Sequence, residues 1–127
     1  MDIVLDTSVL IDALRLRHGR RELLAQLVAD GHHLATTALN IAEVYAGMRA
    51  GEESFTAFFL ESLDCFAVNS AAGKWGGLLK SEWAKKGRTL TLVDTVIAAL
   101  AIEHGCNLLT DNRKDFPMPE LTLYPLL

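Results

Sequence analysis

The stretch I-V-L-D-T-S-V-L-I-D (3–12) places one carboxylate, Asp6, between two apolar runs near the start of the chain. Residues 3–5 have the β-branched, uncharged character of a short buried strand. Residues 7–14 carry apolar side chains on one helical face. An Asp at such a junction is a good helix N-cap, because its carboxylate can accept hydrogen bonds from the first turn. A chemical role for Asp6 would require other carboxylates, distant in sequence, at equivalent ends of elements.

The length and composition are those of one domain spanning residues 1–127, half of them hydrophobic. No apolar run approaches the ~20 residues of a membrane-spanning helix. The N-terminus carries Asp2 and no basic segment, so it does not resemble a signal peptide, and we expect a cytoplasmic protein with no membrane association. Cys65 and Cys106 lie in apolar surroundings without CxxC spacing, which favours buried thiols over a disulfide or a zinc site.

The net charge of −4, from 12 basic and 16 acidic residues, argues at first against a nucleic-acid partner. The basic residues are, however, gathered in three clusters: R-L-R-H-G-R-R (15–21), K-K-G-R (85–88) and R-K (113–114). Local basic patches can bind phosphate groups on a protein that is close to neutral overall. Taken singly, each cluster is more typical of an ordinary solvated loop.

The hydrophobic pattern predicts strands that alternate with helices or helix pairs. Strands are expected at 2–5, 33–36, 66–68, 107–110 and 121–124, and helices at 7–14, 20–30, 38–48, 52–63, 71–86 and 92–104. This order favours an α/β fold with a parallel sheet covered on both faces. Ligands of such sheets bind beyond the carboxyl ends of the strands. Asp6 and Asp111 each follow a strand, so they should lie at the same edge.

Two further acids lie on predicted helices. Glu43 stands in N-I-A-E-V-Y-A-G (40–47), an apolar setting with small or polar neighbours; a salt bridge or simple exposure would explain it equally well alone. Asp94 lies three residues after Thr91, the spacing of a capping box. The helix that follows is uncharged for eight residues, so its start is expected inside the protein rather than in bulk water.

The stretch L-L-T-D-N-R-K-D-F (108–116) adds Asp111, Asn112 and Asp115 after an apolar strand, although such residues are also typical of turns. Four carboxylates that converge would repel one another, so some must protonate or a cation must neutralise them. Oxygen donors without His or Cys select a hard ion such as Mg²⁺ or Mn²⁺. Such an ion suits phosphodiester hydrolysis, because it can activate water and stabilise the leaving oxygen.

The chain resembles the PIN-domain ribonucleases, specifically the VapC-type toxins of type II toxin–antitoxin systems, over essentially its whole length. The resemblance is carried by four motifs in order: D-T-S-V-L-I-D (6–12), N-I-A-E-V-Y-A-G (40–47), L-V-D-T-V-I-A-A-L-A (92–101) and L-L-T-D-N-R-K-D-F (108–116). The resemblance implies a PIN-like three-layer α/β/α sandwich with a central mainly parallel sheet. It also implies an Mg²⁺- or Mn²⁺-dependent endoribonuclease that inhibits translation, with tRNA or rRNA as the substrate.

The resemblance carries roles to individual residues. Asp6 and Asp94 match metal-binding positions, and Glu43 matches a residue that binds the metal or holds the nucleophilic water. Ser8 matches a hydroxyl that positions Asp6 or a ligand water. The fourth acid is favoured at Asp115, because Asn112 occupies the position where some relatives have Asp. Asp111 would then be a bystander.

The resemblance also implies partners. A VapB-type antitoxin would hold the toxin inactive, with its C-terminal tail across the active-site groove and an Arg reaching the carboxylates. A homodimer is implied, and with the antitoxin a heterotetramer or larger assembly. Helices 38–48 and 52–63 carry more apolar and aromatic surface than a small domain easily buries, although Phe55, Phe58 and Phe59 could equally belong to the core.

Three alternatives are weighed against single residues. A response-regulator receiver domain needs a Lys after its last strand, where Tyr124 and Pro125 stand, and a phosphorylated Asp after its middle strand, where C-F-A-V-N (65–69) has none. A haloacid-dehalogenase-type phosphatase needs a second Asp at the position of Ser8. The third is a non-catalytic PIN-like module that binds RNA or protein, against which the retained acids argue.

Overall fold

The computed structural model describes residues 1–126 and forms an α/β fold with four strands in one sheet. In chain order the elements are β1 (Asp2–Leu5), α1 (Thr7–Leu14), α2 (Arg20–Ala29), β2 (His33–Thr37), α3 (Ala38–Ala46), α4 (Glu53–Glu61), β3 (Asp64–Phe66), α5 (Ser70–Lys85), α6 (Leu92–Glu103), β4 (Asn107–Leu109) and a 3₁₀ turn, η1 (Arg113–Asp115). Each predicted helix is present, with ends that differ by no more than two residues. None of these helices is long and apolar enough to cross a membrane.

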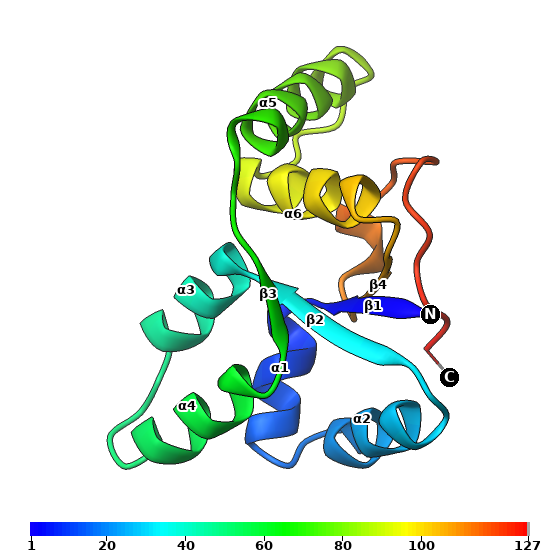
Figure 1. Cartoon of the computed structure of the whole chain (residues 1–127). Helices are drawn as coiled ribbons and strands as arrows, with labels where there is room; N and C mark the ends of the chain where they lie inside the picture. Colours follow the sequence, from blue (N-terminus) through cyan, green and yellow to red (C-terminus); the bar gives the residue numbers. More distant parts are fainter. Residues whose placement is uncertain (127) are drawn as a thin grey trace.

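The sheet is parallel throughout, in the order β3-β2-β1-β4. Helices α5 and α6 cover one face and α1 to α4 cover the other, so the three-layer sandwich is confirmed (Figure 1). Because all four strands run in the same direction, their carboxyl ends meet at one edge of the sheet. That edge receives Asp6 from β1 and the 110–112 segment from β4.

The side chains of β1 divide between two cores. Val4 packs on the α6 side with Ile97, whereas Ile3 and Leu5 pack on the α1 side with Leu10. These three side chains are fully buried, which explains the uninterrupted apolar run in the sequence. The central strand is therefore fixed on both faces, and the position of Asp6 at its end is fixed with it.

Helix α6 is buried almost all round, as its uncharged sequence predicted. Residues 95–101 are buried without interruption. Helix α5 lies close against α6 because Gly76 has no side chain; a Cβ there would lie 2.5 Å from Val96 Cγ2. The first turn of α6, which carries Asp94, is thus held between α5 and the rest of the domain.

Two strand predictions need correction. The segment 121–124 forms only an isolated parallel bridge between Leu108 and Leu123, because Pro125 follows at once and cannot donate to a ladder. The third strand pairs as Asp64–Phe66 rather than 66–68, because α4 ends at Glu61 and pairing begins soon after the turn. As a result Cys65 lies exposed on the edge strand, contrary to expectation, whereas Cys106 is buried as predicted.

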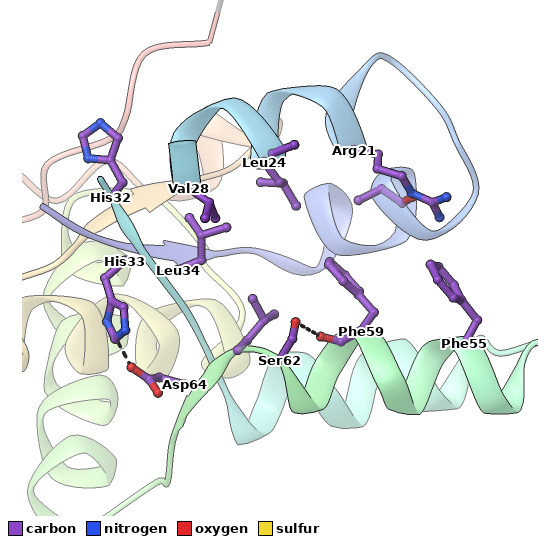
Figure 2. Close-up of a pocket in the computed structure, with 13 residues that line it drawn as sticks. Arg21, Leu24, Val28, His32, His33, Leu34, Phe55, Phe59, Ser62 and Asp64 are labelled. Atoms are coloured by element: carbon purple, nitrogen blue, oxygen red, sulfur yellow. Dashed lines mark hydrogen bonds and ion pairs between the residues drawn. The ribbon is translucent and has the colours of Figure 1, made fainter. Parts of the chain in front are cut away.

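A hollow of about 630 Å³ separates α2 from α4. Phe55 and Phe59 point from α4 towards Leu24 and Arg21 on the opposite wall (Figure 2). The Arg21 guanidinium lies 4.7 Å from the centre of the Phe55 ring. The aromatic residues of 52–63 are divided: Phe59 is partly buried against the core, whereas Phe55 and Phe58 are exposed. The expected excess of apolar surface is therefore present.

Candidate active site

Asp6 links the end of β1 to the start of α1 through its backbone. Its N–H donates to Leu109 O at 3.0 Å, and its carbonyl oxygen accepts hydrogen bonds from the N–H groups of Val9 and Leu10 at 3.1 Å. The carboxylate itself makes no capping hydrogen bond to α1. Asp6 is therefore the N-cap residue, as predicted, but its side chain does not supply the capping hydrogen bond, and the carboxylate is turned to other partners.

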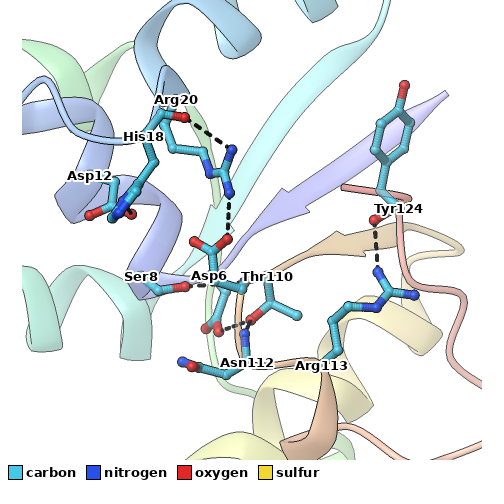
Figure 3. A network of polar contacts seen from close by, with 10 residues as sticks. Asp6, Ser8, Asp12, His18, Arg20, Thr110, Asn112, Arg113 and Tyr124 are labelled. Atoms are coloured by element: carbon cyan, nitrogen blue, oxygen red, sulfur yellow. Dashed lines mark hydrogen bonds and ion pairs between the residues drawn. The ribbon is translucent and has the colours of Figure 1, made fainter. Parts of the chain in front are cut away.

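Those partners come from distant parts of the chain. Thr110 Oγ1 donates to Asp6 Oδ2 at 2.7 Å (Figure 3). Asn40 Nδ2 donates to Asp6 Oδ1 at 3.1 Å. Asp6 is only 4% exposed, and both partners are fully buried. Burial raises the pKa of Asp6, and the charge of Glu43 adds to the rise. Hydrogen bonds from the Thr110 side chain, the Thr7 backbone and the Asn40 side chain oppose it. Desolvation is the larger effect, so the pKa remains raised.

Like Thr7 and Thr110, Asn40 is a site residue that the sequence alone did not single out. Its Nδ2 also donates to Thr7 Oγ1 at 3.0 Å, and its Oδ1 accepts from Thr37 Oγ1 at 2.6 Å. Thr7 Oγ1 in turn donates to Glu43 Oε1 at 2.7 Å. A signal was present in the sequence: Asn40 lies three residues after a helix-capping Thr and three before Glu43, in an otherwise apolar helix. The amide therefore connects both carboxylates.

Asp94 lies half-buried in the first turn of α6. Its N–H donates to Thr91 Oγ1 at 3.1 Å, which confirms Thr91 as the N-cap. Burial, followed by the charges of Asp6, Asp115 and Glu43, raises the pKa of Asp94 to about 6, against the hydrogen bond with Thr91. The structure therefore brings together the four acids singled out in the sequence, near enough for their charges to act on Asp94.

The 110–115 segment separates its two acids. Asp111 Oδ1 forms an ion pair with Arg20 Nη2 at 2.5 Å, and the Asp111 N–H donates to Ser8 Oγ at 3.4 Å. Asp115 ends η1, and its charge acts on Asp94. Asp111 is neutralised by an internal cation, so the geometry fits Asp115 better as the fourth acid.

A bound metal ion fits this donor set if water molecules supply part of its coordination. Within residues 1–126, no three His, Cys, Asp or Glu side chains are gathered closely enough to hold an ion by themselves. Mg²⁺ commonly keeps several waters and uses only one or two carboxylates. Partly buried oxygen donors that also repel one another suit such an ion, because the cation relieves the repulsion. Metal binding by Asp6, Asp94 and Glu43 stays a prediction.

Comparison with known proteins identifies relatives over nearly the full length. The family model "PIN domain" matches residues 3–117. Ribonuclease VapC19 of Mycobacterium tuberculosis (strain CDC 1551 / Oshkosh) is 33% identical over 119 residues, which cover 93% of this chain and 95% of that protein.

Solved structures show the same fold. VapBC2 from Rickettsia felis, bound to a DNA fragment from their promoter, aligns with a TM-score of 0.85 at 25% identity over 98% of both chains. A toxin–antitoxin complex from Klebsiella pneumoniae aligns with a TM-score of 0.77 at 28% identity, covering 98% of this chain and 99% of that chain.

The raised pKa of Asp94 predicts a pH-dependent effect on stability when divalent ions are removed with EDTA. The folded state holds the Asp94 proton more tightly than the unfolded chain, whose pKa is near 3.8. The free energy of unfolding should therefore fall as pH rises from about 4 through about 6. Asp94→Asn has no carboxyl group to ionise, so its free energy of unfolding should not show this fall. The variant should be more stable than the unmodified chain at neutral pH and about equally stable near pH 4. Urea unfolding across this range measures the difference.

Asp30→Asn is the matched control, because Asp30 follows α2 at the opposite edge of the sheet and is exposed. It should show no such pH-dependent gain. A loss of stability in Asp94→Asn of equal size at neutral and acid pH would contradict the raised pKa of Asp94.

Proposed function

The chain belongs to the PIN domain family, and from this we propose that it is a metal-dependent endoribonuclease, the toxin of a VapBC-type pair, acting in the cytoplasm. The observation that carries the proposal is the gathering of Asp6, Glu43 and Asp115 near partly buried Asp94, whose pKa is raised to about 6 first by burial and then by these three charges. Crowding of this kind is unfavourable for folding, and it is typical of sites that act on a ligand.

We assign metal binding to Asp6 and Asp94, with Glu43 as a third ligand or as the group that holds the attacking water. A bound Mg²⁺ or Mn²⁺ would supply Lewis-acid chemistry for hydrolysis of the phosphodiester bond. Asn40 and Thr110 hold the Asp6 carboxylate in one orientation, and Thr7 holds Glu43. Glu43 is exposed, so its second oxygen is free to accept a proton from water at the site.

The test is cleavage of RNA by the purified chain with Mg²⁺ and with EDTA. Asp94→Asn should lose at least about a hundredfold in rate, because even residues outside the ligand shell commonly contribute about 10- to 100-fold. Asp30→Asn should cleave at the unmodified rate, and circular dichroism should show both variants folded. Cleavage that persists in EDTA, or in Asp94→Asn, would refute the metal-dependent site.

RNA binding without cleavage by the unmodified chain would instead favour a non-catalytic PIN-like module. The proposed substrates are tRNA or rRNA, and their loss would inhibit translation. Sequencing of RNA ends after expression of the chain alone would identify the cleaved molecule and the position of the cut.

We further propose that a VapB-type antitoxin binds this chain. The hollow between α2 and α4 supports a helix-in-groove contact, because Leu24, Val28 and Phe59 line it with apolar side chains while polar groups lie at its margins. Val28 is 57% exposed although it is apolar. Phe58 and Leu78 are exposed outside this hollow, so apolar surface remains for a homodimer. With the antitoxin, such a dimer would form a heterotetramer or a larger assembly.

Val28→Glu tests the antitoxin contact, because it places a charge in the apolar hollow without disturbing a buried side chain. Coexpressed with a VapB-type antitoxin encoded beside its own gene, where one is found, the variant should bind that protein at least about tenfold more weakly than the unmodified chain. Val28→Thr, of nearly the same shape, is the matched control and should bind nearly as well. Equal binding by Val28→Glu, or no partner for the unmodified chain, would count against this part of the proposal.

A further inference from the structure

Three basic segments that are far apart in the sequence meet around the carboxylates. Arg20 joins the 15–20 loop to Asp111. The pair Arg113 and Lys114 lies in η1, beside Asp115. Arg88 Nη2 donates to Lys114 O, so the 85–88 segment lies against η1. The fold thus gathers most of the basic clusters of an acidic chain at one edge of the sheet.

The basic segments lie on two sides of the carboxylates, which we call the two flanks. The first flank is the loop between α1 and α2, which is held in one conformation. The Arg17 N–H donates to Asp12 O at 2.7 Å, and His18 Nδ1 lies 2.8 Å from Asp12 Oδ2. Leu16 and His18 adopt left-handed backbone conformations, with φ of 56° and 55°. Such conformations are unfavourable for residues other than Gly and persist where the surrounding contacts impose them. The Arg17 side chain is therefore presented to solvent from a fixed loop.

The second flank is formed by Arg88 and Lys114, both exposed. Arg88 lies three residues before Thr91, which caps the helix that carries Asp94. Lys114 directly precedes Asp115. In the part of the chain that the structure describes, no carboxylate lies within ion-pair distance of Arg17, Arg88 or Lys114. These cations remain free to meet an anion from outside.

The carboxylates lie between the two flanks. On one side Thr110, which donates to Asp6, is followed by the Asp111 that anchors the 15–20 loop. On the other side Asp115, whose charge acts on Asp94, follows the basic pair of η1. Solvated loops would carry scattered cations, whereas these cations belong to segments that adjoin the acidic segments from two sides. This arrangement suits a polyanion whose central phosphate lies at the carboxylates and whose neighbouring phosphates lie outside them.

We propose that Arg17 on one flank, and Arg88 with Lys114 on the other, bind the backbone phosphates of single-stranded RNA on either side of the cleaved bond. The proposal rests on the ribonuclease function proposed above and adds the residues that hold the substrate. Phosphate contacts position a strand without reading its bases. They also make affinity depend on salt, because each contact releases condensed counterions.

The test uses a fluorescein-labelled single-stranded RNA and the chain carrying Asp94→Asn in EDTA, so that binding is measured without cleavage. In this background Arg17→Gln, Arg88→Gln and Lys114→Gln should each reduce the slope of log Kd against log salt by about 0.7. The triple variant should bind at least about tenfold more weakly at low salt. Lys74→Gln is the control, because it removes the same charge from the first turns of α5. Lys74 lies near Asn69, whose side chain donates to Glu103 at the far end of α6. This variant should change neither the salt slope nor the affinity.

Each result distinguishes the two proposals. Unchanged slopes in the three variants, or an equal change in Lys74→Gln, would overturn the phosphate contacts and leave the ribonuclease proposal in place if the unmodified chain cleaves RNA. Reduced slopes together with no cleavage by the unmodified chain would support the phosphate contacts and overturn the ribonuclease proposal.

Discussion

The hydrogen bonds that hold the Asp6 carboxylate connect three parts of the fold at one point. Thr110 reaches it from the end of β4 and Asn40 from α3, while its own backbone joins β1 to α1. A buried carboxylate without partners is strongly destabilising, whereas each hydrogen bond to a charged group contributes roughly 1.5–3 kcal/mol. The site and the fold are therefore stabilised by the same contacts, and the orientation of Glu43 follows from them through Thr7.

The burial and polarity patterns were sufficient to predict much of this arrangement. The apolar run of β1, the capping Thr91 and the uncharged α6 located Asp6 and Asp94 correctly at the ends of buried elements. The role of Asn40 was missed, because a helix pattern does not show which way a polar side chain turns. The pairing of Asp111 with Arg20 joins residues 91 positions apart and leaves no local signal. The segment 121–124 has strand composition, but only one of its residues forms a bridge.

Charge distribution matters more here than net charge. A value of −4 suggests a protein that avoids polyanions, yet Asp94 with its neighbouring acids and the cations of the two flanks lie at the same edge of the sheet. A divalent ion would neutralise the first group, and phosphates would neutralise the second. The apolar hollow between α2 and α4 has different chemistry, suited to a protein partner rather than to RNA.

The shared metal site is the claim on which the proposed chemistry depends, and anomalous diffraction from crystals grown with Mn²⁺ would test it most directly. We expect one strong anomalous peak in contact with carboxylate oxygens of both Asp6 and Asp94, with Glu43 either in contact or joined through a water. The same experiment on Asp94→Asn should lose most of that peak. Crystals at saturating Mn²⁺ with no anomalous density between these side chains would contradict a shared metal site.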